Sequence, residues 1–147
     1  MPNLLIRRAG LSDCGAVSTL GAALFHAEAD ALFPEFTSLL QSEDAAIFLA
    51  LDGAHAVAFA QCQLRHDYVE GAQSSPVAYL EGIYVSPGFR RAGLAASLLA
   101  ACEGWARERD CREFASDCEL DNEASAAFHA HMGFTEVNRI RCFLKPL

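Results

Sequence analysis

The sequence lacks the features that mark several large classes of protein. No apolar run approaches the ~20 residues that cross a bilayer. The first eight residues do not form a signal peptide, because their charges follow the apolar residues. The six cysteines include no Cys-x-x-Cys pair, which argues against a zinc site or a redox motif. We therefore expect reduced thiols, no metal, no membrane contact and a cytoplasmic location.

Positive charge is also scarce. The 147 residues include 11 Lys and Arg against 19 Asp and Glu, a formal net charge of −8. Proteins that bind nucleic acid normally show the opposite balance, so no nucleic-acid partner is expected. An acidic protein attracts cations, and a polycationic small molecule or a basic peptide would fit as its partner. The same charge would also serve solubility alone, and composition does not decide between the two.

The chain has enough apolar residues for one substantial core. Hydrophobic residues make up 52% of the sequence, and its length fits a single domain over residues 1–147. Pro34 is expected to break the first helical pattern, and Asp52-Gly53 to form a hairpin turn. The order of the elements predicts an α/β protein with a mixed sheet. The expected strands are 4–8, 46–51, 57–68, 77–85, 113–117 and 139–144; the expected helices run from Ser12 to about Ala31 and over 35–41, 91–109 and 121–132.

The most informative stretch runs from Tyr84 to Leu99. A strand ends in a Pro-Gly turn, and the basic loop Arg90-x-x-Gly93-x-Ala95 leads directly into an Ala/Leu-rich helix. The first amides of a helix have no partner within it and carry partial positive charge, so they bind anions. Gly93 and Ala95 leave these amides open to a pyrophosphate, and the two arginines add mobile positive charge. An ordinary basic turn before an amphipathic helix is the alternative, since the loop lacks a Walker A Lys-Ser/Thr pair.

This loop resembles the acyl-CoA pyrophosphate loop of the GNAT N-acetyltransferase superfamily. The resemblance implies the GNAT fold, an α/β architecture in which a mixed central sheet with splayed middle strands is flanked by helices. It also implies acetyl-CoA as co-substrate. The predicted order of strands and helices is the one expected of that fold. By resemblance, the CoA-binding residues are Tyr84, Val85, Arg90, Arg91, Ala92, Gly93, Leu94 and Ala95.

A second segment of the resemblance, 121–134, begins a helix with Asn and ends it with Gly-Phe. Asn122 is thereby implied to contact the pantetheine or phosphate arm of CoA. The superfamily often carries a Tyr four residues before the glycine, where it protonates the leaving thiolate. This chain has His129 there, and an imidazolium can make the same transfer because it titrates in the useful range. Packing on the helix is the alternative role for His129.

Three further segments, 66–71, 75–85 and 113–117, resemble the chromosomal-type aminoglycoside 6'-N-acetyltransferases. The resemblance is close from about residue 60 onward and looser over the first 45 residues. Where that family usually carries a substrate-facing Trp, this chain has Leu24-Phe25. The resemblance implies that Tyr68 contacts the aminoglycoside. We expect Phe25 to supply part of the acceptor site as well, with a solvated helix face as the alternative.

Two carboxylates lie where an amine would react. Glu81 is near the end of a predicted strand that continues into the CoA loop, and Asp117 ends a neighbouring strand, where α/β sheets open a ligand crevice. A primary amine with a pKa of about 10.4 is almost wholly protonated at neutral pH, so its acetylation needs a base. We assign that role to Glu81, directly or through water, and expect Asp117 to hold a neighbouring ammonium. A structural role at the strand end is the alternative for Glu81.

The oxyanion that forms during acyl transfer needs a hydrogen-bond donor. We expect the backbone N–H of Val85 to serve, because it follows the strand bulge typical of the superfamily. The amine then attacks the thioester directly, and no cysteine nucleophile is needed.

These features predict an acetyl-CoA-dependent enzyme that acetylates the 6'-amine of aminoglycosides, an antibiotic-resistance activity. Within the superfamily, the alternative is an acetyltransferase for a protein N-terminus, a lysine or a polyamine. Outside the enzymes, the alternative is a regulator that binds acyl-CoA without turnover. We also expect a homodimer, with the apolar terminal strand 140–144 pairing or swapping across a two-fold axis, although an edge strand can equally pair within one chain.

Overall fold

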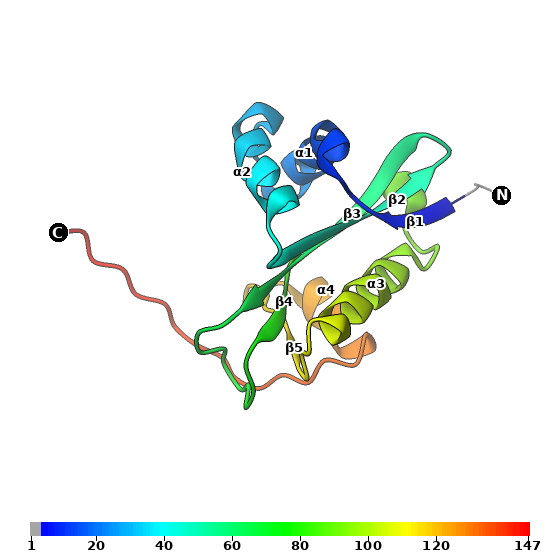
Figure 1. Cartoon of the computed structure of the whole chain (residues 1–147). Coiled ribbons are helices and arrows are strands. Elements are labelled where there is room, and N and C mark those ends of the chain that lie inside the picture. The colour runs from blue at the N-terminus through cyan, green and yellow to red at the C-terminus, as the bar shows by residue number, and fades with distance from the viewer. Residues whose placement is uncertain (1–3) are drawn as a thin grey trace.

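The computed structural model describes residues 4–147, which contain a five-stranded sheet (Figure 1). The first four strands pair in antiparallel fashion, each with the next, whereas the fifth strand runs parallel to the fourth. The sheet is therefore mixed, as the sequence predicted. In spatial and chain order its strands are β1 (Leu4–Arg8), β2 (Ala45–Asp52), β3 (His55–Arg65), β4 (Val77–Val85) and β5 (Phe114–Ala115).

Helices cover both faces of this sheet (Figure 1). α1 (Cys14–Phe25) and α2 (Ala29–Gln41) lie on one face, and α3 (Leu94–Glu108) and α4 (Glu123–His131) lie on the other. Short 3-10 turns, η1 (Leu11–Asp13) and η2 (Pro87–Phe89), lie before α1 and before the loop that leads into α3. The predicted α/β class is confirmed. Over residues 4–147, no helix is long and apolar enough to cross a membrane.

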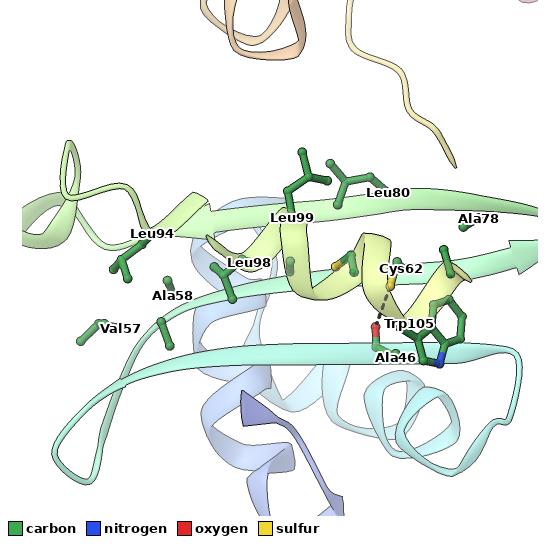
Figure 2. Packing of buried hydrophobic residues seen from close by; sticks show 14 residues of the cluster. Ala46, Val57, Ala58, Cys62, Ala78, Leu80, Leu94, Leu98, Leu99 and Trp105 are labelled. Atoms are coloured by element: carbon green, nitrogen blue, oxygen red, sulfur yellow. Dashed lines mark hydrogen bonds between the residues drawn. The ribbon is translucent and has the colours of Figure 1, made fainter. Parts of the chain in front are cut away.

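An apolar face holds α3 against the sheet (Figure 2). Its buried side chains recur at helical spacing: Leu94, Leu98, Leu99, Cys102, Trp105 and Ala106. Most of the facing strand positions are small, so that the helix approaches closely: Ala46, Ala58, Ala60, Cys62 and Ala78. The Cys62 thiol also donates to the Ala46 carbonyl at 3.6 Å (dashed line in Figure 2). This packing fixes the N-terminal end of α3 a short loop away from the end of β4.

On the opposite face, the pattern predicted two helices separated at Pro34, whereas the two helices of the structure are separated near His26. The chain turns at His26, whose φ of +53° is left-handed, and α2 then runs through Pro34 without ending. The prediction was wrong because tertiary packing overrides the local signal. Phe36 is buried, and its ring comes so close to Gly21 that a Cβ there would lie 2.6 Å from it. This contact needs α2 folded back on α1.

Asp13 holds the turn before α1, which begins at Cys14 rather than at the predicted Ser12. Its Oδ2 accepts the Gly10 N–H at 2.8 Å, and its two oxygens accept from the Arg7 guanidinium at 2.8 and 2.9 Å. The Arg7 hydrogen bonds hold the pKa of Asp13 at about 2, below its usual value. Asp13 therefore ties β1 to the first helical turn.

The strand predictions agree best for β1 and β4, which span the predicted residues. β3 ends at Arg65 instead of Tyr68, and β5 is reduced to two residues. In both strands the pairing with β4 stops before the predicted end, at Arg65 opposite Val77 and at Ala115 beside Tyr79, so the local pattern overestimated how far these two strands continue.

The predicted terminal strand at 139–144 is absent, because residues 134–147 form no helix or strand. The chain instead runs away from the sheet (red in Figure 1). Its apolar side chains are exposed: Ile140, Phe143, Leu144 and Leu147. The apolar residues that suggested a strand instead form an exposed apolar surface. The described part of this chain does not cover that surface.

A bulge in β4 interrupts its pairing with β3. Gln61 lies opposite Gly82 and Cys62 opposite Leu80, so Glu81 has no partner residue on β3. On the other side of β4, β5 pairs only with Ala78 and Tyr79. The end of β4 is thus splayed from β5, as the resemblance implied.

Candidate active site

The loop from β4 to α3 presents helix amides at an open position. Gly93 caps the helix with a left-handed φ of +78°, and a Cβ on it would meet no atom within 4 Å. The first hydrogen bond of α3 runs from the Ser97 N–H to the Gly93 carbonyl at 3.1 Å, so the amides of Leu94 and Ala95 precede it. This arrangement is that of an anion site at a helix N-terminus.

The two arginines of the loop differ in their contacts. Arg91 is exposed, as are Ala92 and Gly93. Arg90, which was expected to be mobile, is anchored: its Nε donates to the Val85 carbonyl at 2.8 Å, and its guanidinium lies 5.6 Å from the centre of the Tyr84 ring. Arg90 therefore stiffens the end of β4, although it is exposed like Arg91.

The amide of Val85 faces the splayed side of β4. The next amide, of Ser86, donates to the Val57 carbonyl of β3 at 2.9 Å. Because successive amides of a strand point to opposite edges, the Val85 N–H points away from β3. No β5 residue pairs with Val85. The position leaves this N–H free to donate to a ligand, and its predicted role at the oxyanion stays a prediction.

A pocket of about 360 Å³ opens on the face of the sheet that carries α1 and α2. Its lining comes from both helices and from the bulged region of β3 and β4: Phe25, Leu32, Glu35, Phe36, Gln61, Gln63 and Glu81. Two carboxylates, Glu35 and Glu81, give it an acidic wall. The structure thus brings Phe25 and Glu81 together, as expected of a substrate site.

Glu81 is bound by an arginine that the sequence analysis missed. Arg65 Nε and Nη2 donate to Glu81 Oε1 at 3.0 and 2.8 Å, and Nη2 also donates to Oε2 at 3.1 Å. The Arg65 guanidinium lies 3.4 Å above the Tyr79 ring, and the Tyr79 hydroxyl donates to Asp117 Oδ2. Burial, and then the hydrogen bond to Asp117, raise the pKa of Tyr79, so the hydroxyl stays a donor.

These contacts form a chain from Glu81 through Arg65 and Tyr79 to Asp117. The two carboxylates singled out from the sequence therefore belong to one cluster. The alternation of polar residues at Gln61, Gln63 and Arg65 within an otherwise apolar strand was the signal that could have identified the arginine.

His129 is held at both ring nitrogens. Nδ1 lies 2.7 Å from the Ser125 carbonyl, which only accepts, so Nδ1 carries a hydrogen. Nε2 lies 2.7 Å from the Ser116 hydroxyl, which donates to it when the ring is neutral. Asn122 Oδ1 accepts the Ser125 N–H at 3.0 Å and caps α4. Both residues thus shape α4. The predicted contact of Asn122 with CoA and the predicted role of His129 as general acid stay predictions.

Tyr68 does not line the pocket. It is 78% exposed, and its hydroxyl donates to Glu70 at 3.2 Å within the loop between β3 and β4. That loop packs on the C-terminal segment, because Gly71 leaves room for the Val137 side chain. Among the residues that the structure describes, no group of three or more His, Cys, Asp or Glu side chains could hold a metal.

The acetyltransferase (GNAT) family model matches residues 17–134, which include β4, the Arg90–Ala95 loop and α4. The chain belongs to this family. The sequence is 42% identical over 144 residues to an aminoglycoside N(6')-acetyltransferase type 1 from Stenotrophomonas maltophilia, covering 97% of this chain and 93% of that protein. It is 48% identical over 115 residues to one from Klebsiella aerogenes, covering 77% and 74%.

Solved structures agree with this assignment. The aminoglycoside 6'-N-acetyltransferase AAC(6')-Ih from Acinetobacter baumannii matches with a TM-score of 0.93 and 36% identity over 99% of both chains. AAC(6')-Iy in complex with CoA matches with a TM-score of 0.95 and 35% identity over 100% of this chain and 97% of that one. The GNAT fold and the resemblance to aminoglycoside 6'-N-acetyltransferases are therefore confirmed.

Proposed function

We propose that this protein transfers the acetyl group of acetyl-CoA to the 6'-amine of aminoglycosides, and so confers resistance to them. One observation carries the proposal: an acidic pocket contains Glu81 on the same strand whose end joins the CoA loop. The relatives named above are aminoglycoside N(6')-acetyltransferases, and AAC(6')-Iy has been solved with the bisubstrate analogue CoA-S-monomethyl-acetylneamine at a TM-score of 0.92.

Acetyl-CoA supplies an acetyl group activated as a thioester. The open space at Gly93 and the unpaired start of α3 fit its pyrophosphate, which the amides of Leu94 and Ala95 and the side chain of Arg91 would hold. The N–H of Val85 would donate to the acyl oxygen as negative charge develops there.

Glu81 in the pocket and Asp117, which lies outside its lining, prepare the amine. Glu81 takes one proton from the substrate ammonium, directly or through a water molecule, and the neutral amine then attacks the acyl carbon. As the tetrahedral adduct collapses, its nitrogen loses a second proton to water and its C–S bond breaks, which gives the amide and the CoA thiolate. Asp117, held by Tyr79, binds a second ammonium of the polycation. The formal charge of −8 adds a general attraction for such a substrate.

His129 is our candidate for the proton that the leaving thiolate needs. Its Nε2 contacts only the Ser116 hydroxyl, so the proton would pass through that group. A protonated ring donates from Nε2 to Ser116 Oγ while the Ser116 hydrogen moves to the sulfur. His129 ends neutral, and Ser116 ends as a hydroxyl again.

A thiol-release assay with acetyl-CoA tests the function. Kanamycin, spermidine and a lysine peptide are offered separately, and kanamycin should give the highest kcat/KM. Preference for the peptide or for spermidine would replace the proposal with the other acetyltransferase activities. Binding of CoA with no transfer to any amine would indicate a regulator.

We also propose that two copies form a dimer through the C-terminal segment, in the cytoplasm. Phe143 and Leu144 are 89% and 95% exposed, and apolar groups in such a run need a cover. Val137 packs at Gly71 and Asn138 Nδ2 donates to Glu70, so the segment is anchored before it leaves the sheet. Light scattering should report a dimer, and Phe143→Asp should give a folded monomer. A wild-type monomer would contradict the proposal.

A further inference from the structure

The carboxylate that must receive the substrate's proton is already occupied. Three hydrogen bonds from Arg65 reach the two oxygens of Glu81, at 2.8 to 3.1 Å. The Glu81 side chain is 21% exposed and lines the pocket, whereas Arg65, 43% exposed, is not among the lining residues. An ammonium that reaches Glu81 from the pocket therefore finds both carboxylate oxygens already bound to the guanidinium.

Stacking on an aromatic ring, as well as the ion pair, holds Arg65 in this position. Its guanidinium stacks on Tyr79, whose hydroxyl is in turn bound to Asp117. A guanidinium keeps its charge at any working pH, and its planar fork matches a carboxylate. The free protein thus keeps Glu81 in one orientation with a fixed cation beside it.

A substrate ammonium can bind Glu81 only by displacing the Arg65 guanidinium. Both groups are monovalent donors, and the exchange at Glu81 leaves the local charge unchanged. The pair is partly solvated, so it is weak enough to open, and the outer side of Arg65 already faces water. The nearby carboxylates of Glu35 and Asp117 offer further ammonium groups of a polycation additional contacts.

We propose that Arg65 is a displaceable counter-ion that occupies the ammonium position at Glu81 and is released when the amine binds. This inference rests on the proposed function, because it deepens the role of Glu81. Arg65 is here a positioning residue that competes with the substrate. Its removal should therefore tighten the binding of the amine, whereas removal of a substrate ligand or a structural residue would weaken it.

Calorimetric titration with kanamycin, in the presence of CoA, tests the idea in a double-mutant cycle. Arg65→Gln should tighten kanamycin binding roughly three- to tenfold, as expected for loss of a bidentate, partly exposed ion pair. Glu81→Gln removes the group for which the two cations compete. In that background Arg65→Gln should have little further effect.

Arg7→Gln is the matched control, because Arg7 makes an equally bidentate pair with Asp13. It changes the net charge by the same unit, so it reports any gain that comes from charge alone. Arg65→Lys, which retains the charge but has fewer donors, should give a smaller gain than Arg65→Gln, and it serves if the glutamine variant does not fold.

Weaker kanamycin binding by both Arg65 variants would overturn the proposal. So would an equal gain in Arg7→Gln, or a gain that persists in the Glu81→Gln background. If the wild type neither binds nor acetylates kanamycin, the proposed function fails, and the same proteins are titrated with spermidine. If Arg65→Gln alone then binds spermidine more tightly than the wild type, the counter-ion role is still supported. Spermidine affinity unchanged in Arg65→Gln would refute that role.

Discussion

A side chain at Gly93 should separate CoA binding from the stability of the fold. A Cβ there meets no atom within 4 Å, so Gly93→Ala adds no clash in the free protein. The φ of +78° is left-handed, which costs a non-glycine residue roughly 1–2 kcal/mol. For a chain of this size that loss lowers Tm by about 2–8 °C.

The effect on CoA should exceed the effect on stability. The new side chain projects into the open space before the α3 amides, and Gly93→Val fills more of it than Gly93→Ala. Losing one hydrogen bond to a charged phosphate oxygen weakens binding by about 1.5–3 kcal/mol, which is roughly 10- to 150-fold in Kd. Separate calorimetric titrations with CoA and kanamycin should show a large loss for CoA alone.

Gly53→Ala is the matched control. Gly53 also has a left-handed φ, +61°, and open space at its Cβ, but it lies in the turn between β2 and β3. This variant should lower Tm by a similar amount and leave CoA affinity unchanged. Wild-type CoA affinity in a folded Gly93→Val protein would refute the pyrophosphate site.

Three other predictions concern charged and titratable groups. Glu81→Gln should mainly lower kcat. Asp117→Asn should mainly raise the KM for kanamycin, while the KM for acetyl-CoA stays nearly constant. Wild-type kinetics with kanamycin in both variants would contradict these roles. His129→Phe should still bind CoA, but its kcat should fall roughly 10²–10⁴-fold. An unchanged kcat with a lower Tm would show that His129 has a structural role only. Arg7 holds the pKa of Asp13 at about 2 in the folded protein, below its ordinary value, so this pair stabilises the fold near neutral pH and the contribution is lost as pH falls toward 2. Asp13→Asn should accordingly lower Tm at pH 7 and have little effect near pH 2; a Tm difference that does not vary with pH would contradict this.

Features that depend on neighbours in the chain were readable from the sequence. The strand Val77–Val85, the loop with Gly93 and the helix that follows were predicted because strand alternation, glycine and helix starts are local signals. Glu81 and Asp117 were predicted as site residues from expected strand ends, which mark ligand sites in α/β sheets, although β5 ends at Ala115, before Asp117. Family and function followed from these segments.

The tertiary structure decided which side chains meet. The Arg65–Glu81 pair depends on the β3–β4 register and on the bulge at Glu81, and neither is encoded in a short stretch of sequence. The helix through Pro34 depends on burial of Phe36 against α1. The terminal residues carry an apolar pattern, but a strand needs a partner edge as well as a pattern. Local chemistry thus pointed to the candidate residues, and long-range packing decided that Glu81 lies beside an arginine.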